Sequence, residues 1–365
     1  MSIRRADTLQ RYGTLALIGA GAMGRVYAGY DAERGIEVAI KRLRSADAGA
    51  IARMRREARV LQRLDHPNLC SLLDWGEAGD EIWLVMPRLP GTDLDACLGE
   101  LDAETRVQVL LQACAGVEAA HRAGLVHRDL KPANLRVDRD HPDGLRVWVM
   151  DFGVAHADDD TTMTAHGDVL GTPQFMAPEQ AAGDVRGIDR RSDVWSLGAI
   201  LFLLLAGRPP FEGESAAAVL TQVLATDAPS PRRFNSAAPR SLERICLRCL
   251  ERDPDRRYGS VGALAADLRR YLAGTEVEAP VVGPAFRLRR SIARHPRSWA
   301  LSAALAGTVI AAGAFAGWTH RQASLRGERA AALAERAERV RSAVRIAHLE
   351  PLHDVRPDYA RIETD

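Results

Sequence analysis

The stretch that most constrains this chain is His127-Arg128-Asp129-Leu130-Lys131-Pro132-Ala133-Asn134. It brings a carboxylate, an ammonium group and a side-chain amide close together, at Asp129, Lys131 and Asn134. A carboxylate can accept the proton of a hydroxyl group, an ammonium can neutralise a phosphoryl group, and an amide oxygen is a hard ligand for magnesium. These groups suit phosphoryl transfer from a magnesium-bound nucleotide to a hydroxyl. The alternative is a solvated charged turn, and the other segments of the chain decide between the two.

A glycine-rich segment, Gly19-Ala20-Gly21-Ala22-Met23-Gly24, follows a short apolar run near the N-terminus. Glycine lets a hairpin close over phosphates because no Cβ keeps the backbone away. Alone, this pattern also fits a dinucleotide-binding turn. The next predicted strand, Val38-Ala39-Ile40-Lys41, ends in a lysine where a dinucleotide fold would need an acidic residue for the ribose. The lysine therefore favours a hairpin that binds the phosphates of a nucleotide.

Together these segments resemble the glycine-rich loop, the lysine strand and the catalytic loop of protein kinases. Lys131, two residues after Asp129, is typical of the Ser/Thr-directed form. The triplet Asp151-Phe152-Gly153 resembles the metal-binding triplet of kinases, and Ala177-Pro178-Glu179 resembles the end of their activation segment. The chain is most similar to the bacterial Ser/Thr protein kinases of eukaryotic type.

The resemblance implies an α+β fold of two lobes, a small β-rich lobe and a larger helical lobe, over residues 11–272. Asp193 would bind the backbone of the catalytic loop, and Arg257 would pair with Glu179. Both residues lie beside apolar segments, which favours buried ion pairs over plain surface charges.

The resemblance also assigns roles to individual residues. Asp129 would orient the substrate hydroxyl, and Lys131 would stabilise the transferred phosphoryl. Lys41, paired with Glu57 of the helix that follows, would hold ATP. Asn134 and Asp151 would bind Mg²⁺. The residues expected to contact the nucleotide are Ile18, Gly19, Ala20, Gly21, Gly24, Val26, Ala39, Lys41, Met86, Leu89 and Arg136.

Arg136 departs from the family pattern. Kinases usually place an apolar residue there as the floor under adenine, whereas this chain has Leu135-Arg136. The guanidinium could stack on the purine, or the side chain could point outward along its apolar stem. Pro87, next to the predicted gatekeeper Met86, replaces the usual acidic residue but removes only a donor that the family does not use.

A long polar segment between Phe152 and Ala177 carries the candidate regulatory phosphosites, Thr162 and Thr164, ahead of Thr161. Arg128 precedes the catalytic aspartate, which in kinases marks enzymes whose activation loop is ordered by phosphorylation. Phosphothreonine adds nearly two negative charges that an arginine can bind. Thr172 is better interpreted as part of the substrate pocket.

The C-terminal part of the chain has a different character. Residues 273–298 form an arginine-rich linker, and residues 299–318, bounded by Trp299 and Trp318, contain no charged residue. A helix of this length spans about 30 Å, which is enough for a bilayer core. Arginines before it predict a cytoplasmic kinase, a single-pass inner-membrane protein, and an extracytoplasmic helical tail over 319–365. An Ala-rich soluble helix is the alternative for 299–318. Pairing of two copies through Gly313 and Gly317 is left open.

Composition adds limits. The formal net charge is only +1, so bulk electrostatics do not indicate a nucleic-acid partner. The five cysteines have no disulfide-framework spacing and indicate reduced thiols. Cys246 and Cys249 could form half of a zinc site, but they fit the apolar face of a helix better. The N-terminus lacks the apolar region of a signal peptide.

Two functional alternatives remain beside a membrane-tethered Ser/Thr kinase. One is a pseudokinase that binds partners through the same fold, and Arg136 is the feature that favours it. The other is a membrane scaffold that acts through the basic linker and the distal helix. The sequence leaves the protein substrates and the sensed signal undefined.

Overall fold

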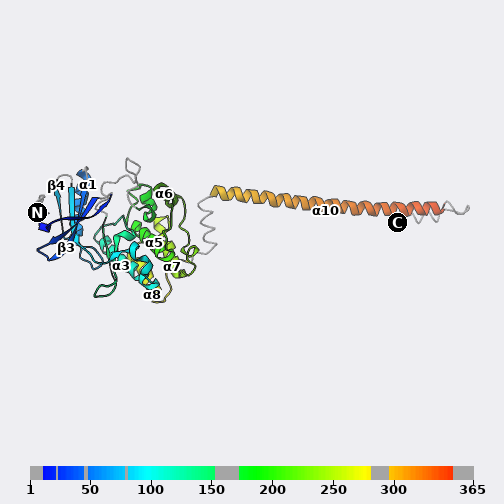
Figure 1. Ribbon diagram of the computed structural model, residues 1–365. Helices are drawn as coiled ribbons and strands as arrows, with labels where there is room; N and C mark the ends of the chain where they lie inside the picture. The colour runs from blue at the N-terminus through cyan, green and yellow to red at the C-terminus, as the bar shows by residue number, and fades with distance from the viewer. Residues whose placement is uncertain are drawn as a thin grey trace. The chain divides into compact units, whose positions relative to one another are not determined.

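The computed structural model describes residues 11–21, 24–44, 48–78, 81–152, 172–280 and 296–347. The chain divides into two compact units, residues 1–281 and 282–365. The first contains a β-rich lobe followed by a larger helical lobe, drawn in blue and in cyan to yellow in Figure 1. The predicted two-lobed α+β fold is confirmed.

The small lobe is built on a five-stranded antiparallel sheet in the order β1-β2-β3-β5-β4. Its elements are β1 (Ala16–Gly21), β2 (Gly24–Asp31), β3 (Ile36–Arg44), α1 (Ala48–Leu61), β4 (Asp74–Ala78) and β5 (Glu81–Pro87). Residues directly opposed on neighbouring strands share a face of the sheet. Val26 lies opposite Lys41, and Lys41 lies opposite Leu84, so these side chains share one face. Helix α1 packs in the same apolar cluster as Leu84, through Met54 and Ala58.

The helical lobe follows the hinge, residues 87–91, which joins the two lobes, and it contains the main core of the molecule. Its longer helices are α3 (Ala103–Arg122), α5 (Arg190–Ala206), α6 (Ala216–Ala225), α7 (Arg240–Cys249) and α8 (Val261–Leu272). Its shorter elements are β6 (Thr92–Asp93), α2 (Leu94–Cys97), η2 (Leu98–Glu100), η3 (Pro132–Asn134), β7 (Leu135–Asp138), β8 (Arg146–Val149), η5 (Pro173–Phe175), α4 (Pro178–Ala181), η6 (Pro231–Arg233) and η7 (Pro254–Arg256). Helix α5 lies at the centre, since every residue from Ser192 to Leu205 is buried.

Local sequence signals fix the ends of these helices. Asp102 and Asp189 begin α3 and α5, and each side chain accepts a hydrogen bond from a backbone N–H of the first turn. Helix α5 ends at Gly207, whose left-handed φ of 74° suits glycine and whose N–H bonds back to Leu203 O. These caps place both ends of the central helix, and with them the residues that α5 presents to the catalytic loop.

The packed chain of the helical lobe continues past α8. Val277 and Ala279 are buried in the main core. Asp267 accepts hydrogen bonds from Glu278 N at 2.7 Å and Ala279 N at 3.0 Å. Arg244 donates to Val277 O at 3.2 Å and to Ala279 O at 2.7 Å. The first residues expected to belong to the linker are therefore packed into the kinase lobe, where a buried carboxylate and a guanidinium bind their backbone.

The second unit contains one long helix, α10 (Pro296–Ala347), of 52 residues. The segments expected as a membrane span and as a distal helix are thus one continuous helix. Within the described residues it is long and apolar enough to cross a membrane, by length and composition, over Trp299–Arg345. At about 1.5 Å per residue it measures roughly 78 Å, more than twice a bilayer core.

Candidate active site

Asp193 binds the backbone of the catalytic loop. Its carboxylate accepts hydrogen bonds from His127 N at 2.8 Å and Arg128 N at 2.9 Å. It also lies 2.6 Å from Nε2 of His121, on α3, whose side chain is 5% exposed. Arg128 has a left-handed φ of 67°, a conformation that costs a non-glycine residue free energy and that neighbouring contacts must maintain. The Asp193 bonds are such contacts, so α5 sets the shape of the loop.

The carboxylate of Asp129 is held by the two other polar residues of the loop. Lys131 Nζ lies 2.8 Å from Asp129 Oδ2. Asn134 Nδ2 donates to Asp129 O at 2.7 Å and to Oδ2 at 3.1 Å. Asn134 is buried and Asp129 is partly exposed. The three groups predicted from the sequence therefore meet at one point, with a positive charge beside the carboxylate.

His127 links the catalytic loop to the segment of Asp151. Its Nε2 lies 2.8 Å from Met150 O, and its ring lies 4.5 Å from that of Phe152. Asp129 N donates to its Nδ1 at 3.3 Å. Burial lowers the pKa of His127, and the nearby carboxylates of Asp193 and Asp129 do not offset this. A neutral imidazole with its proton on Nε2 matches both hydrogen bonds.

Lys41 forms an ion pair with Asp151, with 2.9 Å between Nζ and Oδ1. The sequence predicted Glu57 as the partner of Lys41; that pair stays a prediction. Glu57 lies half-buried on α1, next to Ala58, which packs on the sheet. Asp151 has a left-handed φ of 54°, the second strained non-glycine residue of the site. Lys41 and Asp151 therefore bring the two lobes into direct contact.

Of the residues expected around the nucleotide, Val26, Ala39, Lys41 and Met86 share one face of the small sheet. Ala39 lies opposite Met86, two residues from Lys41, and shares its face. Strand pairing brings Gly19 opposite Val26, and Gly21 opposite Gly24. Gly24 has a φ of 130°, and a Cβ there would lie 2.0 Å from Arg42 O. Only glycine therefore fits where the β1–β2 hairpin turns. The other expected residues on β1 are Ile18 and Ala20, and Leu89 follows β5.

Asn134 and Asp151 suit a magnesium ion by their chemistry. The amide nitrogen of Asn134 donates toward Asp129, which directs the amide oxygen to the other side. Carboxylate and amide oxygens are the ligands that Mg²⁺ prefers in proteins. The donor set fits the expected metal, and the ammonium of Lys41 lies beside one of the two carboxylate oxygens.

The guanidinium of Arg136 points toward the segment after the hinge. Its Nη1 lies 2.9 Å from Asp93 Oδ1, and its Nε donates to Pro90 O at 3.2 Å. Of the two arrangements open from the sequence, this contact favours the one in which the charged head lies beside the cleft rather than on the purine. In the hinge itself, Arg88 N donates to Glu37 O at 3.0 Å.

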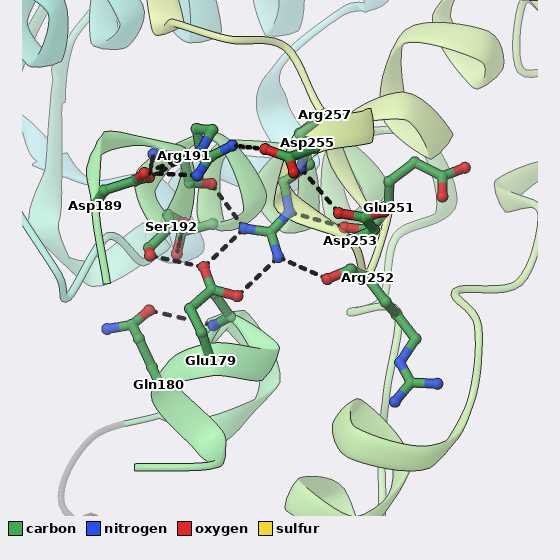
Figure 2. Close-up of polar contacts among 12 residues, drawn as sticks. Glu179, Gln180, Asp189, Arg191, Ser192, Glu251, Arg252, Asp253, Asp255 and Arg257 are labelled. Atoms are coloured by element: carbon green, nitrogen blue, oxygen red, sulfur yellow. Dashed lines mark hydrogen bonds and ion pairs between the residues drawn. The ribbon is translucent and has the colours of Figure 1, made fainter. Parts of the chain in front are cut away.

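Glu179 and Arg257 form the predicted buried ion pair (Figure 2). Both guanidinium Nη atoms contact the carboxylate at 2.8 Å, and Ser192 Oγ donates to it at 2.7 Å. Burial by itself raises the pKa of Glu179, but the bonds from Arg257 and Ser192 outweigh it and lower the pKa. Arg257 also donates to three backbone carbonyls, those of Arg191, Glu251 and Arg252. This pair fixes the segment that follows the activation loop.

Three further positions were missed from the sequence. His121 contacts Asp193, and Gln180 Nε2 donates to Arg128 O at 2.7 Å. These partners are 72 and 52 residues apart, so no local pattern indicates them. Cys70 lies in a cavity beside the active site, and burial raises the pKa of its thiol to about 12. The cavity is lined by Lys41, Leu43, Leu61, Cys70, Leu72, Leu84, Met86, Asp151 and Phe152.

The candidate phosphosites Thr162 and Thr164 lie outside the described residues, as do Thr161 and Gly153. Thr172 lies within them, immediately before η5. The short helix α4 that follows contacts the catalytic loop through Gln180.

Comparison with known proteins identifies the class to which this fold and site belong. Residues 12–268 match the protein kinase domain family, and the chain therefore belongs to it. It is 38% identical to the serine/threonine-protein kinase PrkC of Bacillus subtilis over 265 residues, which are 71% of this chain and 40% of PrkC. It is 35% identical to PknB of Mycobacterium leprae over 283 residues, 74% of this chain and 44% of PknB. The resemblance to bacterial Ser/Thr kinases is confirmed.

Solved structures agree with this assignment. A double mutant of the PknI kinase domain from Mycobacterium tuberculosis covers 71% of this chain and 97% of its own length, with a TM-score of 0.57 and 25% sequence identity. The chain spans less than half the length of PrkC and PknB. The similarity therefore describes the catalytic part of these relatives.

Proposed function

We propose that this chain is an ATP-dependent protein kinase that phosphorylates Ser and Thr hydroxyls and is held at a membrane by α10. The observation that carries the proposal is the Asp129 carboxylate, bound by Lys131 and Asn134, together with the ion pair between Asp151 and Lys41. Membership of the protein kinase family supports it.

In the proposed reaction, the substrate hydroxyl oxygen forms a bond to the γ-phosphorus of ATP, and the bond to the β–γ bridging oxygen breaks. Asp129 accepts the hydroxyl proton, ADP leaves, and Lys131 compensates the negative charge on the transferred group. Lys41 holds the phosphates. Bound at Asn134 and Asp151, Mg²⁺ would neutralise phosphate charge.

The decisive experiment is phosphate transfer from radiolabelled ATP to a generic protein substrate by the full chain in detergent. Asp129→Asn should reduce transfer by about 10²- to 10⁴-fold, because the carboxylate acts on the hydroxyl, while ATP binding is retained. Lys41→Ala should remove transfer by weakening phosphate binding. Asp140→Asn, on an exposed turn, is the matched control and should leave transfer unchanged. Transfer that survives Asp129→Asn contradicts the assignment, and ATP binding without transfer in the unaltered chain favours a pseudokinase.

Regulation by autophosphorylation is part of the proposal. Arg128 is exposed beside Asp129, and its main chain is tied to α4 through Gln180. Phosphothreonine at position 162 or 164 would bind the guanidinium of Arg128 and order the loop. Mass spectrometry of active protein should find phosphate at Thr162 or Thr164, and Arg128→Ala should remove the activation that phosphorylation brings. Fully active protein without phosphate on the loop would contradict this part.

The location proposed is the inner membrane, crossed once, with the kinase domain in the cytoplasm. The length and composition of α10 support this, as do the arginines that precede Trp299.

Two copies would pair through Gly313 and Gly317, which lie one turn apart on the helix. Replacing both by Ile should lower crosslinking and autophosphorylation in membranes. Ala304 and Ala311, on the opposite side of the helix, provide the control pair, and equal effects of the two double variants would leave α10 as a plain anchor.

A further inference from the structure

The residue expected as the floor of the proposed nucleotide site, Arg136, carries a charge. Arg136 lies in the middle of β7, between Leu135 and Val137. These neighbours are 0% and 2% exposed and belong to the core of the helical lobe. Because side chains alternate along a strand, Arg136 projects from the opposite face, away from that core. The residue that the family makes apolar is therefore an arginine on the side of the sheet that faces away from the helical core.

The guanidinium of Arg136 already has two polar partners, Asp93 and Pro90. Strand pairing places Asp93 directly opposite Arg136. Nη1 contacts the Asp93 carboxylate at 2.9 Å, and Nε donates to Pro90 O at 3.2 Å. The two side chains are 28% and 39% exposed, so this ion pair lies at a rim and not in a core. Both partners belong to the segment that directly follows Leu89, whose N–H is expected to bind adenine.

These two contacts of the guanidinium determine which part of the Arg136 side chain can lie beneath the purine. A guanidinium whose Nε donates to Pro90 O and whose Nη1 contacts Asp93 is held beside the segment that follows Leu89. What remains is the stem, three methylene groups that can pack on an apolar surface while the charge stays in a wetter place.

We propose that the Arg136–Asp93 pair is a purine-positioning device: Asp93 holds the guanidinium at the rim, so that the stem of Arg136 forms the floor beneath the base. The device rests on the nucleotide site proposed above. It makes Asp93 a positioning residue that acts through Arg136. Neither residue takes part in phosphate transfer.

A double-mutant cycle on ATP binding tests the device. Isothermal titration with the full chain in detergent compares the unaltered protein, Asp93→Asn, Arg136→Met and the double variant. Asp93→Asn should weaken ATP binding about fivefold in the unaltered background, the scale of a partly exposed ion pair. In the Arg136→Met background, where the floor has no charge to hold, the same substitution should change binding less than about twofold. Arg136→Ala, which removes the stem, should bind ATP more weakly than Arg136→Met.

Two controls separate positioning from a general effect. Adenosine binding should show the same coupling between positions 93 and 136 as ATP does, whereas inorganic tripolyphosphate binding should show none. The Arg146–Asp143 pair, 3.2 Å long and on the β8 side of the neighbouring turn, provides a matched site through Asp143→Asn, which should leave ATP binding unchanged.

The outcomes are distinct. Equal weakening by Asp93→Asn in both backgrounds would mean that Asp93 contacts the nucleotide directly, and would overturn the device. Absence of weakening in both would overturn it as well. If the unaltered chain binds no ATP, or binds it equally after Lys41→Ala, the proposed nucleotide site itself is wrong, which is a different result from an ATP-binding protein without coupling.

Discussion

Two glutamate–arginine pairs of the same chemistry lie in the two units of this chain. Glu179 and Arg257 join α4 to the segment before α8 at 2.8 Å, and their side chains are 8% and 0% exposed. Glu335 and Arg339 lie one turn apart on α10 at 3.3 Å, and their side chains are 73% and 72% exposed. The first pair joins residues 78 apart in sequence, whereas the second lies on the exposed surface of a single helix. Equal chemistry therefore has unequal consequences.

The difference extends to the two units as a whole. In the kinase unit, buried polar groups bind each other across long sequence separations, as Asp193 does with His127 and Asp267 does with Ala279. In α10 the large apolar side chains are exposed, among them Leu305 and Val309. Tertiary contacts thus hold the first unit, while the second depends on backbone hydrogen bonds and, as we propose, on lipid.

The largest expected effect comes from breaking the buried pair. Glu179→Ala leaves the charge of Arg257 buried without its carboxylate, which should lower the free energy of unfolding of the kinase unit by about 3–5 kcal/mol. Glu335→Ala should change the stability of either unit by less than about 0.5 kcal/mol. Denaturant unfolding of the full chain in detergent, followed by tryptophan fluorescence, measures both.

Glu179→Gln sharpens this comparison. The amide keeps an acceptor for Arg257 but loses the charge, so the variant should lie between Glu179→Ala and the unaltered protein. Similar small losses for Glu179→Ala and Glu335→Ala would show that burial does not separate the two pairs.

A glycine in each unit gives the second comparison. Gly198 lies in α5, and a Cβ there would lie 2.3 Å from Cys249 Cβ on α7. Gly307 lies in α10, with no atom within 4 Å of such a Cβ. Gly198→Ala should lower the free energy of unfolding by about 1–3 kcal/mol, because α5 and α7 must separate. Gly307→Ala should instead stabilise its helix, by up to about 1 kcal/mol, because alanine favours the helical backbone.

Circular dichroism of thermal unfolding, in the full chain, distinguishes these two results by sign. Gly207→Ala, at a left-handed φ but with open space around it, adds a strained backbone without a clash. If Gly198→Ala were as mild as Gly307→Ala, the close packing of α5 on α7 would be wrong.

The sequence predicted the parts of the site that are made by residues close together in the chain, and it did not predict several of the contacts between residues far apart. Asp129, Lys131 and Asn134 were predicted together because six consecutive residues contain them, and they do meet in space. Lys41 was predicted for the site, but its contact with Asp151 depends on how the two lobes meet. The fold class followed from the resemblance to protein kinases, and it is confirmed.

The details that escaped prediction are those set by strand register and helix packing. The sequence left two arrangements open for Arg136, and its partner Asp93 lies 43 residues earlier, brought opposite by the pairing of β6 with β7. His121 was not identified because Asp193 is 72 residues away. In α10 the predicted membrane span and the helical segment predicted after it form one continuous helix, and residues 319–347 include no proline.

The smallest expected effect is a pH dependence that belongs to the kinase unit. Burial lowers the pKa of His127 below that of an exposed histidine, and burial lowers the pKa of His66 as well. Near pH 6 the unfolded chain therefore binds more protons than the folded one, so stability rises with pH in this range. The contribution of His127 should be fully present above its unfolded pKa of about 6.5 and should be lost below it, by at most about 1.4 kcal/mol per pH unit.

His127→Gln should flatten the dependence of unfolding free energy on pH between 7 and 5.5. His66→Gln, at a half-exposed position, should flatten it less. An unchanged slope after His127→Gln would mean that the pKa of His127 is the same in the folded and unfolded chains, and a steeper slope would mean that the folded chain keeps the proton on His127.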